Sequence, residues 1–342
     1  MILPPCLFFS GGDTKRTGPN ESWHKKNRSR CARKENQMKT EKVKIKSNVD
    51  NLEIECLLII PDTEIKGIVQ LAHGMNEYKE RYIDFMGFLA QNGYACIIND
   101  HRGHGKSIKN KEDLGYFYDN KAEAVIEDLY QITKYMKERF PNKKIVLFGH
   151  SMGSMIVRKY IAKYDDKIDG LIVCGSPSEN KNAKFGLMLI KIAEIFKGEK
   201  YRSKLLKKLM FGGFNKKNET INSWICTNED IVEKYNKDNL CRYDYTLNGL
   251  ENIVRLMIDI YNPKIYRKNN LNLPIYFIAG SDDPVITSIE KWNKAQEFLE
   301  KQGYKNISGT LYENMRHEIL NETQNEIVYS DILVWIENII KN

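Results

Sequence analysis

The sequence predicts an α/β fold in which helices cover both faces of a mostly parallel sheet. Short apolar runs rich in β-branched residues alternate with longer stretches whose apolar residues recur at helical spacing. Continuous apolar runs are typical of parallel strands that are buried on both faces. The alternation stops at about residue 178 and resumes near residue 263. We therefore expect a helical insertion at the carboxyl end of the sheet, where open α/β folds bind ligands.

The first half of the chain supplies most of the predicted sheet. A helix at 78–92 ends before Gly93, a residue type that often terminates helices. A second helix, at 121–140, gathers its apolar residues on one stripe. The remaining elements follow the same reasoning, with strands at 52–60, 67–72, 94–99, 144–149 and 169–175, and a helix at 152–164.

The last part of the chain completes the predicted sheet, with strands at 274–280 and 306–312 and helices at 288–301 and 322–340. Pro177 and Pro263 bracket the insertion. We assign residues 38–177 and 263–342 to the core and 178–262 to a helical cap. Residues 1–37 lack apolar periodicity and are rich in Gly, Asn, Ser and basic side chains, so we expect a disordered extension there.

The positive charge of the chain is concentrated in two places. The 342 residues include 53 Lys and Arg against 45 Asp and Glu, a net charge of +8. Residues 1–37 carry +5, residues 181–211 carry +7, and the remainder carries −4. Since the body with the predicted sheet is slightly acidic, the total charge does not indicate nucleic-acid binding. The composition, 42% hydrophobic and 29% charged, excludes disorder of the whole chain.

The seven cysteines are scattered and form no CxxC pair. Cys56, Cys96 and Cys174 fall within predicted strands, which is typical of buried, reduced thiols. No apolar run approaches the length of a membrane-spanning helix. We therefore expect a cytoplasmic protein without a disulfide framework, a metal site or a cofactor.

The sharpest motif is Gly149-His150-Ser151-Met152-Gly153, between a predicted buried strand and a predicted helix. When a strand turns into a helix this abruptly, the residues two positions before and after the turn residue must be small. Gly149 and Gly153 hold these positions around Ser151. This context predicts a nucleophile elbow that exposes the Ser151 hydroxyl above the sheet. The amide of Met152, at the start of the helix, would point toward the same place and stabilise an oxyanion.

A second segment, His73-Gly74-Met75, directly follows the strand at 67–72. An oxyanion hole needs a second amide from the loop after such an early strand, and Met75 is the candidate donor. Gly74 would allow the turn. His73 would brace the loop, although an ordinary core histidine fits the pattern equally well.

Candidate acid and base residues follow the last predicted strands. Asp282 and Asp283 come after the strand at 274–280, and Pro284 sets a turn that favours Asp283 facing the sheet. Asp282 remains the alternative. His317 lies just past the final strand, where an imidazole could bridge the acid and Ser151.

The segment Asp100-His101-Arg102-Gly103-His104-Gly105-Lys106-Ser107 invites a phosphate or metal interpretation. It lacks the spacing of a phosphate-binding loop, and no further ligand cluster supports a metal. We therefore expect a structural loop braced by hydrogen bonds.

These motifs resemble the monoacylglycerol lipase and lysophospholipase branch of the α/β-hydrolases, which is also described as serine aminopeptidase-like. The similarity covers about residues 43–340 and rests on HGMNEYKERY (73–82), DHRGHGKS (100–107), GHSMGS (149–154), GSDDPV (280–285) and His317. It implies the α/β-hydrolase fold, with a mostly parallel eight-stranded sheet, helices on both faces and an inserted cap. It also implies Ser151 as nucleophile, Asp283 as acid and His317 as base, with Met75 and Met152 as oxyanion donors.

The resemblance implies a serine hydrolase that cleaves esters of single-chain lipids, either monoacylglycerol or lysophospholipid. One alternative is an aminopeptidase or amidase in which Glu229, Asp230 and Glu233 hold a substrate amine. A short-chain carboxylesterase and a binding protein without activity are the others. Epoxide hydrolases and dehalogenases need an aspartate where this chain has Ser151.

The stretch 181–211 mixes apolar side chains with lysines. A basic amphipathic helix of this kind can lie on an anionic membrane surface. The same pattern also fits a helix that packs its apolar face on the core and exposes its lysines to water.

Overall fold

The computed structural model describes residues 38–119, 121–215 and 220–341. The predicted extension at 1–37 lies outside the described residues, as do Cys6, Cys31 and His24. The described residues form one eight-stranded sheet in the order β1-β2-β4-β3-β5-β6-β7-β8. From β4 to β8 all neighbours are parallel, while β1 and β2 are antiparallel additions at one edge. The predicted fold class is therefore confirmed.

Seven of the eight strands in the described residues lie in the predicted intervals, whereas the edge strand β1 was not predicted, because its apolar residues alternate with charged ones and form no continuous run. Their bounds are β1 Met38–Lys46, β2 Glu53–Pro61, β3 Gly67–Ala72, β4 Tyr94–Asn99, β5 Ile145–His150, β6 Gly170–Cys174, β7 Ile275–Gly280 and β8 Ile307–Tyr312. Every residue of β3, β4, β5, β6 and β7 is buried, because helices cover these strands on both faces. Cys56, Cys96 and Cys174 are buried free thiols in this sheet, as predicted.

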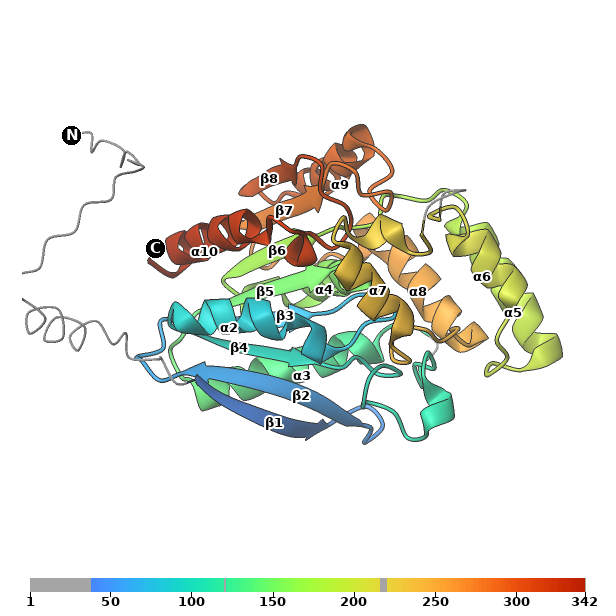
Figure 1. The fold of residues 1–342 in the computed structure, drawn as a ribbon, viewed down its shortest axis with the longest axis horizontal. Helices are drawn as coiled ribbons and strands as arrows, with labels where there is room; N and C mark the ends of the chain where they lie inside the picture. The colour runs from blue at the N-terminus through green and yellow to red at the C-terminus, as the bar shows by residue number, and fades with distance from the viewer. Residues whose placement is uncertain (1–37, 120, 216–219, 342) are drawn as a thin grey trace, which may run out of the picture. The chain divides into compact units, whose positions relative to one another are not determined.

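Helices form a layer on each face of the sheet (Figure 1). On one face, α2 (Ile83–Gln91) and α10 (Asn325–Lys341) bury Phe85, Leu89, Val328 and Ile332 against the strands. The other face is covered by α3 (Ala124–Arg139), α4 (Met152–Tyr164) and α9 (Ile289–Gln302). The site loops lie at the carboxyl ends of the parallel strands between these layers.

Three helix starts differ from the prediction. The helix expected at 322–340 begins at Asn325. The helix expected at 121–140 begins at Ala124, because the Asp119 carboxylate accepts hydrogen bonds from the amides of Glu123 and Ala124 and caps it there. The helix expected at 78–92 begins with a 3₁₀ turn, Lys79–Tyr82, before α2. In that turn the buried Lys79 ammonium reaches the Asp100 carboxylate at 2.6 Å.

The described residues between β6 and β7 form four α-helices, within the interval predicted as a cap. They are α5 (Ala183–Lys197), α6 (Lys204–Phe211), α7 (Glu229–Lys237) and α8 (Leu247–Asp259). Helix α8 is buried along most of its length and joins the main hydrophobic cluster through Leu247, Leu250 and Ile253. Helices α5 and α6 lie at the outer edge of the molecule (Figure 1).

Candidate active site

Ser151 lies at the turn from β5 into α4, with a half-buried side chain. Its backbone angles, φ 54° and ψ −117°, are unusual for a residue with a side chain. A side chain at Gly149 would collide with the Gly153 carbonyl, and one at Gly153 with the Ala72 carbonyl. The two glycines therefore allow α4 to approach the end of β3 closely enough to form the strained turn.

The loop after β3 lies directly against Ser151. A Cβ atom at Gly74 would stand 3.0 Å from the Ser151 Cβ, so the loop approaches the turn with no space for a side chain. Met75 follows with a half-buried side chain. Met152 is the first residue of α4, and the first amides of a helix have no intrahelical acceptor. Two loops that carry candidate amide donors therefore meet at the candidate nucleophile.

Buried His73 braces this loop through both ring nitrogens. Its Nε2 accepts a hydrogen bond from the His101 amide at 3.0 Å, so Nδ1 carries the proton and donates to the Gly74 carbonyl at 2.8 Å. Burial, together with the neighbouring His101 and His104, holds the pKa of His73 well below its usual range. His73 is therefore a neutral structural group that links two loops.

Asp283 and His317 form a buried pair. The His317 Nδ1 lies 2.9 Å from the Asp283 Oδ2, and both residues are nearly inaccessible to water. The second oxygen of Asp283 accepts from the Val285 amide at 2.8 Å. Asp282 is exposed, and its side chain contacts Ser281. Of the two candidates left open by the sequence, only Asp283 contacts the imidazole.

The His317 ring also lies near the candidate nucleophile's own turn. Its centroid is 4.6 Å from that of His150, the residue before Ser151. A Cβ at Gly175, after β6, would lie 3.1 Å from His317 and 3.3 Å from the Asp283 carboxylate. The carboxyl ends of β5, β6, β7 and β8 thus bring these groups together from segments far apart in sequence.

A buried charged network beneath the site was not anticipated. Glu77 Oε1 accepts from the Gly74 amide and lies 3.0 Å from His150 Nδ1, while His150 Nε2 donates to the His317 carbonyl. Arg81 contacts Glu77 and makes two hydrogen bonds, at 2.8 and 2.7 Å, to Glu318. This network ties the β3 loop, the Ser151 turn and the His317 loop together.

The charges in this network support one another. Burial disfavours the Glu77 carboxylate, but His150 and Arg81 outweigh burial and lower the pKa of Glu77 to about 2. Burial also disfavours the imidazolium of His150, yet Glu77 outweighs it and raises the pKa of His150. Nothing in the sequence distinguishes Glu77 from a solvated loop glutamate, because its partners lie up to 73 positions away.

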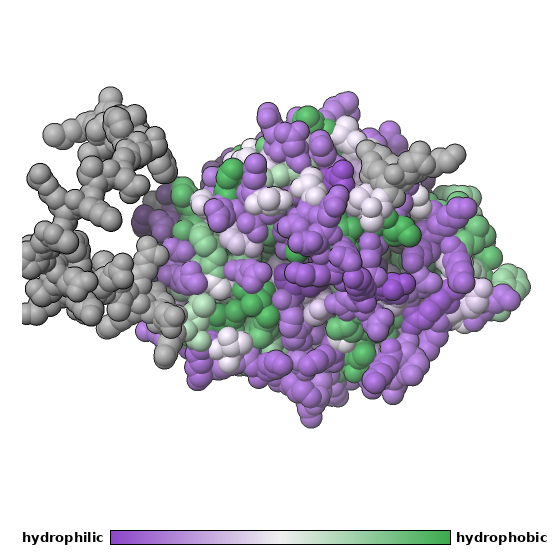
Figure 2. All heavy atoms as spheres, viewed as in Figure 1, coloured by the Kyte–Doolittle hydropathy of each residue, from purple (hydrophilic) through white to green (hydrophobic). Residues whose placement is uncertain are grey.

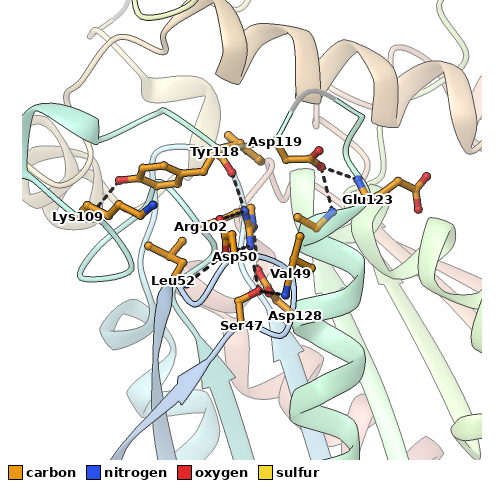
Figure 3. Close-up of polar contacts among 12 residues, drawn as sticks. Ser47, Val49, Asp50, Leu52, Arg102, Lys109, Tyr118, Asp119, Glu123 and Asp128 are labelled. Atoms are coloured by element: carbon orange, nitrogen blue, oxygen red, sulfur yellow. Dashed lines mark hydrogen bonds and ion pairs between the residues drawn. The ribbon is translucent and has the colours of Figure 1, made fainter.

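The segment 100–107 is the braced loop that the sequence predicted. Arg102 donates to Asp128 and Asp50, to the Ser47 hydroxyl and to a backbone carbonyl, so its guanidinium is fully engaged (Figure 3). His104 bonds the Tyr245 hydroxyl at 2.6 Å, and that hydroxyl accepts from the Asn76 amide. In the described part of the chain, no three His, Cys, Asp or Glu side chains are grouped to hold a metal ion.

The three carboxylates considered for an aminopeptidase lie on the surface of the insertion. Glu229, Asp230 and Glu233 are all exposed on α7, and Glu233 pairs with Lys237 on the same helix.

Comparison with known proteins places this geometry in a family. A family profile described as serine aminopeptidase, S33, matches residues 63–324. The monoacylglycerol lipase of Mycolicibacterium smegmatis is 25% identical over 279 residues, covering 81% of this chain and 90% of that protein. Human monoglyceride lipase is 23% identical over 304 residues, covering 84% and 88% of the two chains.

Solved structures agree with this placement. The crystal structure of a highly thermostable carboxyl esterase from Bacillus coagulans in complex with glycerol aligns with a TM-score of 0.81 at 28% identity. The alignment covers 89% of this chain and all of that one. These matches confirm the resemblance inferred from the motifs. The chain is therefore a monoacylglycerol lipase-like α/β-hydrolase and belongs to the serine aminopeptidase S33 family.

Proposed function

We propose that this carboxylic ester hydrolase cleaves acyl esters of single-chain lipids, monoacylglycerols or lysophospholipids, through an acyl-enzyme on Ser151. The observation that carries the proposal is the buried His317–Asp283 hydrogen bond, 2.9 Å long, beside the strained turn at Ser151. A nucleophile, a base and an acid from three segments converge there, as acyl transfer requires.

In the proposed mechanism, His317 accepts the proton of Ser151 as the hydroxyl attacks the ester carbonyl. Asp283 orients the imidazole and stabilises its cationic form. His317 then protonates the departing alcohol, which is glycerol from a monoacylglycerol or a glycerophosphodiester from a lysophospholipid, and the acyl group remains on Ser151. Water, activated by the same imidazole, hydrolyses this acyl-enzyme and releases the fatty acid.

The amides of Met75 and Met152 are the proposed oxyanion donors. Met152 directly follows Ser151 at the start of α4, and Met75 directly follows Gly74, whose backbone approaches Ser151 closely. His73 and Gly74 would hold the Met75 amide in place, since the Gly74 carbonyl and amide are both hydrogen-bonded, to His73 and Glu77. A preorganised pair of donors stabilises the charge that develops on the carbonyl oxygen.

The helical insertion is a second argument for a lipid substrate. We propose that residues 178–262 act as a cap over a core of 38–177 and 263–342, because four consecutive helices separate β6 from β7. Two of the most similar curated relatives are named for monoacylglycerol hydrolysis. A single acyl chain would need such an apolar cover to reach a half-buried serine.

We also propose that α5 and α6 contact an anionic membrane surface. Ile190 packs inward with no exposure, yet Ile195 and Phe196 of the same helix are 80% and 78% exposed, and Leu205 and Leu209 of α6 are similarly open. Figure 2 shows hydrophobic residues at the edge of the molecule that these helices occupy. Exposed apolar clusters of this kind often mark interaction sites.

Charge contributes less to this surface than its sequence indicates. Lys191, Lys200 and Lys207 form ion pairs with Glu251, Asp113 and Asp244, all of which lie outside the basic stretch. We therefore expect apolar insertion to dominate, with a smaller contribution from anionic lipid. Among the helices that the structure describes, none is long and apolar enough to cross a bilayer.

Vesicle flotation tests the membrane proposal. The enzyme should float with vesicles that contain anionic lipid, and the double substitution Ile195→Ser, Phe196→Ser should abolish flotation. Ile327→Ser with Val334→Ser, on the exposed side of α10, is the matched control and should leave it unchanged. Absence of flotation of the unaltered enzyme with any vesicle would overturn the proposal.

Labelling and substrate panels test the catalytic proposal. A fluorophosphonate should label the enzyme at Ser151, and Ser151→Ala should remain unlabelled. A panel of p-nitrophenyl esters of graded chain length, with monoacylglycerol and lysophosphatidylcholine, should show preference for long single chains. Preference for short esters would indicate a general carboxylesterase, and cleavage of amino-acid arylamides alone would indicate an aminopeptidase.

We finally propose a reducing, cytoplasmic location. The cysteines of the described residues, Cys56, Cys96, Cys174, Cys226 and Cys241, are all buried free thiols, and burial raises the pKa of each. Such inert thiols fit a compartment that keeps cysteine reduced.

A further inference from the structure

The chain of the cap passes directly beside His317. A short 3₁₀ turn, Ser223–Ile225, precedes α7. The Arg316 guanidinium donates to the Ser223 carbonyl at 2.6 Å, and the Glu318 amide donates to the Ile225 carbonyl at 2.6 Å. The residues immediately before and after His317 are therefore both hydrogen-bonded to the cap.

The contact continues along both segments. Thr227 donates to the Glu322 carboxylate from its amide, at 3.0 Å, and also from its hydroxyl. The same carboxylate accepts from the Arg316 amide at 2.7 Å. Glu322 is 4% exposed or less, so water competes little for these bonds. The loop that carries His317 thus takes its position from the cap as well as from the core.

Trp224 lies at the centre of this contact. Its ring centroid is 5.3 Å from that of His317, with the two planes tilted by 39°, and Phe214 supports it at 4.9 Å. The hydrogen bond to Asp283 fixes the Nδ1 atom of His317 but leaves the ring able to tilt about that bond. An adjacent indole restricts this tilt, which determines whether Nε2 points toward Ser151.

We propose that Trp224 is a positioning residue for the base, held in the cap by the contacts of Ser223–Ile225 and Thr227 with the His317 loop. The inference rests on the proposed function, since it takes His317 as the base. It assigns the cap a part in the chemical step, beyond covering the acyl chain. The indole would also stabilise the imidazolium that forms when His317 takes the Ser151 proton, because indole faces attract cations within about 6 Å.

The test measures kcat, normalised to the number of active sites, and KM for the unaltered full chain and for its Trp224 variants. Fluorophosphonate titration counts competent sites, and p-nitrophenyl acetate is the substrate because its acyl group is too short to probe a lipid pocket. Trp224→Leu should lower kcat by about tenfold or more and change KM by less than about threefold. Trp224→Phe, which keeps an aromatic face, should recover most of the lost kcat.

Trp335→Leu is the matched control. Trp335 is also half-buried and stacks on Tyr276 at 5.6 Å, within the core and without a contact to His317. Its loss should lower the melting temperature while kcat per site stays within about twofold. If Trp224→Leu yields no folded protein, Trp224→Met replaces it under the same criteria.

Three results would contradict one proposal or the other. If the unaltered enzyme is labelled and active but Trp224→Leu keeps its kcat, the positioning role is wrong and the proposed function stands. If Trp224→Phe is as slow as Trp224→Leu, the aromatic contact is likewise not the cause. An unaltered enzyme that neither binds fluorophosphonate nor cleaves esters overturns the proposed function itself.

Discussion

The loops around Ser151 bury charged side chains, whereas helices α5 and α6 expose apolar ones. Both arrangements are the reverse of what is usual in folded proteins. Around Ser151, charged Glu77, His150 and Glu318 are buried. On α5 and α6, large apolar side chains such as Ile195 and Phe196 are exposed. Folding stability favours neither arrangement, because buried ion pairs are expensive to desolvate and exposed apolar surface stays in contact with water. Both regions are better explained by what they do than by what they contribute to stability.

The difference also concerns tolerance to change. In the buried network each group satisfies two or three others, so one substitution leaves several partners unpaired. On α5 and α6 the exposed side chains contribute little to the core. Substitutions in the first region should therefore have large effects on activity and stability, whereas those in the second should affect only what the surface binds.

The largest effect is expected at Asp283. Asp283→Asn should lower kcat by about 10³-fold to 10⁴-fold, because the amide cannot hold the same imidazole tautomer or stabilise its cation. Asp282→Asn, at the exposed neighbour, is the control and should change kcat by less than about twofold. Ester hydrolysis per labelled site measures both, and equal losses in the two variants would contradict the assignment of Asp283.

A large effect on stability is expected at Glu77. Glu77→Gln leaves His150 buried without its carboxylate, while Arg81 keeps its contact with Glu318, and should lower the free energy of unfolding by about 3–5 kcal/mol. Glu80→Gln, which removes a more exposed partner of Lys79, should lower it by less than about 1 kcal/mol. Urea unfolding at pH 7 gives both values. Similar losses would remove the distinction between the buried network and ordinary ion pairs.

Acid should destabilise the region around Ser151. The pKa of Glu77 is lowered to about 2, so its stabilisation is present above about pH 4.5 and lost as the pH falls toward 2. Burial lowers the pKa of His101 to about 3 and of His104 to about 4, so the folded state also loses stability as the pH falls below 6.5.

Urea unfolding at pH 7, 6 and 5 measures this loss. The raised pKa of His150 acts in the opposite direction, since its stabilisation is present below about pH 6.5 and is lost as the pH rises through that raised value. His104→Gln removes one of the buried imidazoles and should reduce the fall in stability between pH 7 and pH 5. An unchanged slope in this variant would show that the buried histidines do not cause the acid sensitivity.

The smallest effect on folding is expected at the exposed cap surface. Ile195→Ser with Phe196→Ser should change the free energy of unfolding by less than about 0.5 kcal/mol for each substitution. Ile190→Ser, on the inward side of the same helix, should lower it by about 2–5 kcal/mol. Thermal or urea unfolding makes the comparison. A large loss in the double variant would mean that the exposed side chains stabilise the fold after all.

Several strands and site residues could be predicted from the sequence alone. The strands at 67–72, 94–99 and 144–149 were predicted because continuous apolar runs between turns are visible without any knowledge of contacts, and the structure places the third at Ile145–His150. The glycines around Ser151 were predicted because a strand that turns sharply into a helix needs them. Asp283 was preferred over Asp282 from turn chemistry and resemblance, and the structure shows which of the two contacts His317.

The contacts of other site residues could not be predicted from the sequence, although Glu77 and Arg81 lie within the segment 73–82 that carries the family resemblance. Glu77, Arg81 and Trp224 acquire their positions from partners that are 73, 237 and 93 positions away in the chain. The sequence also overstated the free positive charge of residues 181–211. The acids that pair with Lys191, Lys200 and Lys207 come from other segments. Charge and burial are sums over neighbours in space, which local periodicity does not report.

By itself, the sequence determined the order of seven strands and of the helices between them outside the insertion, the interval that interrupts them and the turn at Ser151. These depend on local spacing and on the backbone freedom of glycine, which a chain carries before it folds. Only the tertiary structure decided which aspartate meets His317, how Glu77 and His150 become a stable charged pair, and which apolar face of α5 stays exposed. Each of those depends on desolvation and contact between distant segments, and these arise when the sheet brings its carboxyl ends together under the cap.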